Sequence, residues 1–131
     1  MKWKYACPNC KAVLNPNVKI ILKSRRGKQS GLMLISSRLG NYQTICDEQF
    51  GDKVQEGQLV EFSCPVCDAV LTSPASKKLA EILMYREGGD VKRIQFSRVY
   101  GEEATFMIDG DTVVPYGEDA AAYDEVNFFG C

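Results

Sequence analysis

Residues 5–14 read YACPNCKAVL, and residues 62–71 read FSCPVCDAVL. The two ten-residue segments are identical at six positions, and both begin with an aromatic residue. Each contains a C-P-x-C motif, whose proline sets the backbone angle φ for a tight turn and has no N–H of its own. We expect each segment to be a strand that delivers the first cysteine, followed by a turn that ends at the second. The repeat therefore joins two distant parts of the chain at one site.

The repeat supplies four potential metal ligands, which are Cys7, Cys10, Cys64 and Cys67. Four thiolates in a tetrahedron form the usual closed structural zinc site. The chain contains no histidine, which excludes mixed cysteine–histidine zinc sites and histidine catalysis. Because four sulfur ligands leave no open position for water or substrate, the sequence predicts a structural Zn²⁺ and no catalytic residue.

The two segments resemble the knuckles of zinc-ribbon and rubredoxin-like proteins. The resemblance covers about 20 of the 131 residues, and it implies a metal-bearing element rather than a particular function. Rubredoxins and many zinc ribbons have glycine after the second cysteine of each knuckle, whereas this chain has Lys11 and Asp68. A side chain there crowds the N–H···S hydrogen bonds, which favours zinc over iron. A rubredoxin-like iron electron carrier is the alternative.

Two of the six cysteines, Cys46 and Cys131, lie outside the repeat. The chain starts without an apolar signal segment, so we expect a cytoplasmic protein in which paired C-x-x-C motifs bind metal. Its longest apolar runs are far below the ~20 residues of a membrane span, so we expect no membrane contact. A further alternative is a thiol oxidoreductase in which a C-x-x-C pair, or Cys46 with Cys131, cycles.

The predicted fold class is mainly β: an antiparallel sheet with a rubredoxin-like or zinc-ribbon site, a hairpin insertion and a C-terminal β-meander. Apolar residues 18–23 and 32–35 flank the polar stretch 24–31, which predicts a β-hairpin with a basic, mobile tip. Residues 1–72 would form the knuckle pair with this inserted hairpin. Residues 73–131 would form the meander and an acidic tail, and both parts would make one compact unit.

The meander is predicted from short apolar runs separated by glycine and aspartate turns. Residues 80–87 are rich in apolar side chains and fit a strand, although residues 79–86 would also fit one face of a helix, and the double-glycine turn after them favours the strand. We expect residues 117–131 to form one helical turn or to wrap the surface. The other predicted strands are 58–63, 91–100, 105–108 and 112–114.

The formal net charge of −1 conceals an uneven distribution. Residues 1–46 contain nine lysines and arginines and no acidic residue, whereas residues 101–131 contain eight acidic residues and no basic one. In one interpretation, Arg25, Arg26 and Lys28 at the hairpin tip contact phosphate or an acidic partner, and Trp3 and Tyr5 stack on bases. In the other, the acidic tail covers the basic half and both aromatics are core residues.

These observations favour a non-enzymatic intracellular zinc-binding module that contacts a protein or a nucleic acid through the basic hairpin. The pI of about 5.5 is well below the value above 9 that is typical of dedicated nucleic-acid-binding domains. The sequence contains no glycine-rich phosphate loop and no G-x-S-x-G nucleophile motif. The charge asymmetry also suits head-to-tail self-association.

Overall fold

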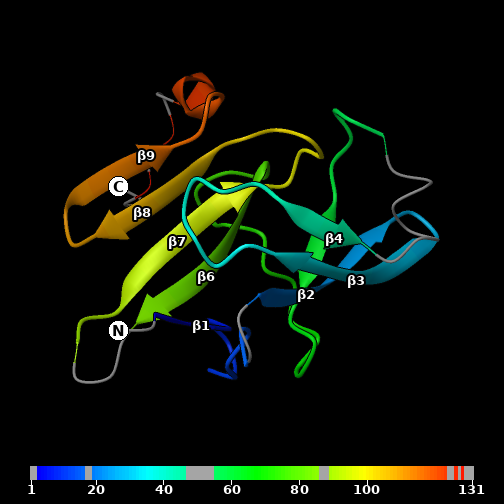
Figure 1. Cartoon of the computed structure of the whole chain (residues 1–131), viewed down its shortest axis with the longest axis horizontal. Coiled ribbons are helices and arrows are strands. Elements are labelled where there is room, and N and C mark those ends of the chain that lie inside the picture. The colour runs from blue at the N-terminus through cyan, green and yellow to red at the C-terminus, as the bar shows by residue number, and fades with distance from the viewer. Residues whose placement is uncertain are drawn as a thin grey trace.

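The structure is a computed structural model that describes residues 3–16, 19–46, 55–85, 89–123, 126 and 128. Within these residues, nine strands form two antiparallel sheets (Figure 1). The five-stranded sheet has the order β1-β6-β7-β8-β9, and its strands are β1 (Lys4–Ala6), β6 (Leu79–Tyr85), β7 (Lys92–Ser97), β8 (Thr105–Asp109) and β9 (Thr112–Tyr116). The four-stranded sheet has the order β4-β3-β2-β5, and its strands are β2 (Ile20–Arg26), β3 (Gln29–Ile35), β4 (Thr44–Cys46) and β5 (Glu61–Ser63).

The mainly β prediction is confirmed, including the antiparallel pairing, the β2–β3 hairpin and the β6-to-β9 meander. The helix considered for residues 79–86 is wrong for the part that the structure describes, because Leu79–Tyr85 is strand β6. Both faces of β6 are covered, which explains its nearly continuous apolar run. Because β1 pairs with β6, the five-stranded sheet contains strands from both the 1–72 and the 73–131 segments.

The β2–β3 hairpin is longer and tighter than the sequence predicted. Its strands extend to Arg26 and resume at Gln29, so the turn contains only Gly27 and Lys28. Gly27 has a φ of 60°, a value that suits glycine at the first central position of a two-residue hairpin turn. The turn thus occupies only two residues of the polar stretch 24–31, and Arg25 is a strand residue.

The main core lies between the two sheets. Alternate residues of β2 point inward, including Ile20 and Leu22, and they share one apolar cluster with Ile82 and Ile94 of the five-stranded sheet. Successive strand side chains point to opposite faces, so Lys23 and Arg25 lie on the outer face of the four-stranded sheet.

A second core covers the other face of the five-stranded sheet. There Phe106 of β8 packs against Tyr123 and Phe128 of the C-terminal segment, with ring centroids 5.7 and 4.8 Å apart. Residues Ala120–Tyr123 form the 3₁₀-helix η1, the single helical turn expected of this segment. The described part of the tail thus packs on the five-stranded sheet instead of covering the basic half. No helix in the described part of the chain is long and apolar enough to cross a membrane.

Candidate metal centre

The two knuckles connect the sheets at one place. β1, an edge strand of the five-stranded sheet, leads into the first knuckle, and β5, an edge strand of the four-stranded sheet, leads into the second. After each knuckle the chain continues into the opposite sheet. The Leu14 carbonyl accepts a hydrogen bond from Ile21 N of β2, and the Leu71 carbonyl accepts one from Glu81 N of β6. Both knuckles lie at the lower edge of the view in Figure 1, in blue and green.

The knuckles repeat the same hydrogen bonds, as their shared sequence predicts. Each first cysteine donates its N–H to the alanine carbonyl five residues later, over 3.0 Å in both knuckles. Each first cysteine also accepts, at its carbonyl, the N–H of the residue four positions on, which is Lys11 or Asp68. Bridges between Ala6 and Val13 and between Ser63 and Val70 close the two loops.

Lys11 and Asp68 have left-handed backbone angles, with φ of 66° and 63°. Among the described residues, they are the non-glycine residues with positive φ. Glycine adopts this conformation with no steric cost, whereas other residues do so at a cost of roughly 1 kcal/mol. The knuckles therefore form this left-handed backbone without glycine. The side chains of Lys11 and Asp68 do not prevent it, so their presence does not by itself favour zinc over iron.

The four sulfur atoms gather into one cluster. Cys7 Sγ lies 3.7 Å from Cys67 Sγ, and Cys10 Sγ lies 3.7 Å from Cys64 Sγ. All four lie within 4.8 Å of one another. A tetrahedral zinc site with Zn–S bonds of ~2.3 Å has sulfur atoms about 3.8 Å apart. The four predicted ligands are thus together, with a spacing that can hold a metal ion.

Backbone N–H groups point at the sulfur atoms. Cys7 Sγ accepts from Asn9 N at 3.3 Å and from Cys10 N at 3.5 Å, and Cys64 Sγ accepts from Val66 N and Cys67 N at the same two distances. These donors stabilise negative charge on buried sulfur, which a four-thiolate site needs.

The two halves of the site differ in exposure and in proton affinity. Cys7 and Cys64 are fully buried, whereas Cys10 is exposed and Cys67 is half-buried. Burial raises the pKa of Cys64 to about 12. Hydrogen bonds, first from the Asn9 side chain and then from the Ala69 backbone, lower the pKa of Cys67 to about 6. A metal ion must therefore displace a proton from Cys64 to bind.

The Asn9 side chain is a site residue that the sequence analysis missed. Its Nδ2 donates to Cys67 Sγ of the other knuckle over 3.5 Å. Aligning the two repeats gives a signal for it, because Asn9 corresponds to Val66, which has no side-chain donor. The Lys23–Asp68 ion pair is a second missed contact, and it links β2 to the second knuckle.

The three predicted partner-binding residues lie at the hairpin end but differ in their surroundings. Arg25 forms an ion pair with Glu61 at 3.1 Å, and its side chain is 62% exposed. Arg26 donates from Nη1 to the Leu59 carbonyl over 2.9 Å, so it also supports the fold. Lys28 is exposed in the turn.

The remaining candidate residues have separate positions. Tyr5 is buried in the main core and donates its hydroxyl to the Ser37 carbonyl over 2.6 Å, so of the two interpretations the one that makes it a core residue is confirmed. Trp3 packs against the main core with Lys92 Nζ 5.1 Å from its ring centroid. Cys46 ends β4, and Cys131 lies outside the described residues.

Comparison with known proteins finds no match: no family model, no curated protein and no solved structure corresponds to this chain. Its function is therefore inferred from the site and the surface.

The protonation of Cys64 predicts a pH-dependent metal affinity. The apparent affinity for Zn²⁺ is expected to rise by at least about tenfold per pH unit between about pH 6.5 and 8.5, because the Cys64 proton must leave. Competition with a chromophoric chelator measures this slope. Asn9→Ala should weaken binding most at the acidic end, because the pKa of Cys67 then rises, and Val66→Ser is the control that keeps all four sulfurs. An affinity independent of pH would contradict the prediction.

The left-handed conformation of Lys11 predicts an unusual effect of glycine. Lys11→Gly should raise the free energy of unfolding by up to about 1 kcal/mol, because strain in the folded state is removed. Lys4→Gly in strand β1 is the control. It should lower the free energy of unfolding by about the same amount, because glycine destabilises a strand. Chemical denaturation of both metal-loaded variants provides the comparison. If both variants lose stability equally, the backbone at Lys11 is not strained.

Proposed function

We propose that this chain is a non-enzymatic zinc-binding module whose four-cysteine zinc joins the two sheets and whose basic hairpin face binds a protein partner. The structural role of the zinc is supported by the position of the four-cysteine cluster, which lies between edge strands of the two different sheets. A closed site with four protein ligands suits a structural role, because no coordination position is left for substrate.

The candidate interface is the outer face of the four-stranded sheet, which we call the basic–apolar face. Register places Lys23 beside Leu32, Arg25 beside Ser30, and Leu34 beside Ile45. Leu32 and Ile45 are 50% and 54% exposed, which is high for large apolar residues. They share this face with the cations Lys23 and Arg25. Apolar side chains grouped on an exposed face are typical of interaction sites.

The composition of this face favours a protein over a nucleic acid. Proteins that bind single strands stack bases on aromatic side chains, and the large exposed apolar residues of the described chain are all aliphatic. Tyr5, one of the two aromatics considered for stacking, is buried. An acidic protein surface with an apolar centre would contact Leu32 and Lys28, and it would compete with Asp68 and Glu61 for their exposed ion-pair partners, Lys23 and Arg25.

Photo-crosslinking tests the interface. A photoreactive amino acid at position 32 should capture a discrete acidic partner, and the same group at the exposed position Val91 should not. With that partner purified, Arg25→Glu combined with Lys28→Glu should weaken binding at least about tenfold. Lys77→Glu with Lys78→Glu makes the same charge change elsewhere on the exposed surface and should leave binding unchanged.

Two results would contradict the proposed interface. One is equal loss of affinity in both double variants, which would indicate a general charge effect. The other is tight binding of random-sequence oligonucleotides with a steep salt dependence that Arg25→Glu and Lys28→Glu reduce, because that result would assign the face to nucleic acid.

A further inference from the structure

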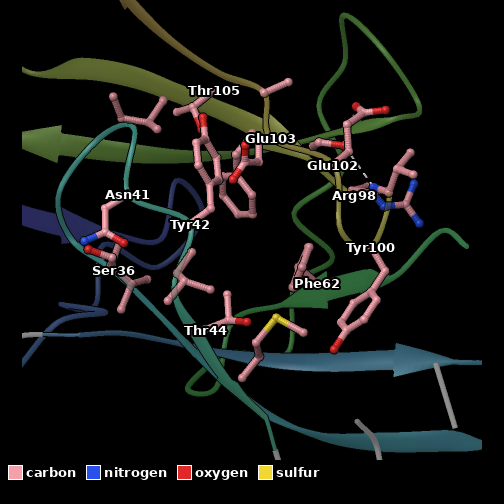
Figure 2. Close-up of a pocket in the computed structure, with 18 of the residues that line it drawn as sticks. Ser36, Asn41, Tyr42, Thr44, Phe62, Arg98, Tyr100, Glu102, Glu103 and Thr105 are labelled. Carbon is pink, nitrogen blue, oxygen red and sulfur yellow. Dashed lines mark hydrogen bonds between the residues drawn. The ribbon is translucent and has the colours of Figure 1, made fainter. Parts of the chain in front are cut away.

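A cavity of about 330 Å³ opens between the sheets, and the four clustered cysteines are not among its lining residues. Its lining includes residues of the β3–β4 connection, among them Ser36, Asn41 and Tyr42, and residues 98–104 of the β7–β8 connection (Figure 2). Small-molecule sites in proteins have volumes of roughly 300–1,000 Å³. The cavity is thus large enough for a small ligand, and neither the metal nor the basic–apolar face accounts for it.

The cavity is lined by aromatic rings and by apolar core residues. Tyr42, Phe62 and Tyr100 surround it in Figure 2, and Phe96 also lines it. The rings of Phe62 and Phe96 pack with centroids 5.4 Å apart and planes inclined by 58°. Aromatic faces carry a negative potential that attracts cations, with an energy of roughly 0.5–2 kcal/mol for each favourable contact.

One wall of the cavity is held in place by specific hydrogen bonds and by close packing. The Tyr42 hydroxyl lies 2.9 Å from Thr105 Oγ1 and 3.1 Å from the Tyr116 carbonyl. Gly117 has a φ of 98°, and a Cβ there would lie 2.6 Å from the Tyr42 hydroxyl and 2.2 Å from the Glu103 carbonyl oxygen. Only glycine fits this position, so Tyr42 and Glu103 are fixed relative to each other.

Glu103 has a fixed backbone and an available carboxylate. Its N–H donates to Asp119 Oδ2, and its carbonyl accepts the Asp119 N–H, both over 2.9 Å. Its own carboxylate has no hydrogen bond or ion pair with the part of the chain that the structure describes. By contrast, the Glu102 carboxylate accepts hydrogen bonds from Ser97 and Tyr123.

The charges around the cavity favour a cation. Three acidic residues, Glu56, Glu102 and Glu103, and two arginines, Arg38 and Arg98, are among its lining residues. The Arg98 guanidinium donates hydrogen bonds to the Val60 and Lys77 carbonyls, and Arg38 is an exposed residue. Burial raises the pKa of Tyr42, and the negative charges of Glu103 and Asp119 raise it further, which is the effect of a negative potential at this wall.

We propose that this cavity binds a small organic cation, an alkylammonium group on a compact apolar body. The ammonium group would lie against the faces of the aromatic rings, the Glu103 carboxylate would balance its charge, and Met33 and Ile35 would pack on the apolar body. A bare metal ion would not use the apolar lining, and an organic anion would be repelled by the Glu103 carboxylate. The inference does not depend on the proposed partner-binding function.

Three ligands of nearly the same shape test the role of charge: choline, 3,3-dimethylbutan-1-ol and 3,3-dimethylbutanoate, which are cationic, neutral and anionic. Each is titrated into the metal-loaded full chain and followed by amide chemical shifts in NMR. Choline should bind at least about tenfold more tightly than the neutral alcohol, with shifts concentrated at residues 36–44 and 96–105, and the butanoate should bind most weakly.

Two variants locate the effect. Glu103→Gln should remove most of the preference for choline over the alcohol, whereas Glu118→Gln, an acidic residue outside the cavity lining, should keep it. Amide spectra of both variants without ligand establish that the fold is retained. Equal binding of choline and the alcohol, tighter binding of the butanoate, or shifts confined to residues outside the cavity would each overturn the proposal.

Discussion

The four-sulfur cluster brings together edge strands of the two sheets, and we propose that a metal bound there holds their arrangement. Each knuckle starts at the edge of one sheet and returns the chain to the other sheet, through Leu14 toward β2 and through Leu71 toward β6. The chain thus passes from one sheet to the other twice, once at each copy of the repeat. These two crossings place the four cysteines where the edges of the sheets meet. A metal bound there closes a loop between Cys10 and Cys64, and this loop contains the entire β2–β3–β4 insertion.

This arrangement separates the metal from the surfaces that could contact other molecules. The cluster has four protein ligands and two fully buried sulfurs, which suits a structural role. The outer face of the four-stranded sheet carries cations and exposed aliphatic side chains, while the cavity between the sheets is lined by aromatic residues and by Glu103. The two surfaces use different chemistry, so one chain could engage a macromolecule and a small ligand independently.

The repeat made the metal site predictable, because Cys-Pro-x-Cys fixes both the ligands and the local turn. The strands of the meander were also predictable from their glycine and aspartate turns. The extent of the β2–β3 hairpin is not predictable from polarity alone, because polar Ser24 and Arg25 belong to strand β2, where they alternate between the buried and the exposed face. The cavity was beyond prediction, since Tyr42, Phe62 and Glu103 meet only through the packing of the two sheets.

Metal analysis of the protein purified without added metal, combined with its visible spectrum, tests the central claim most directly. If a structural zinc joins the sheets, the protein should contain one zinc per chain and have no visible absorption, and it should lose much of its thermal stability when a chelator removes the metal and recover it when zinc is returned. One iron per chain, with thiolate charge-transfer bands that bleach on reduction, would contradict this claim. A metal-free chain that is equally stable would also contradict it, because the cluster would then not be what holds the sheets together.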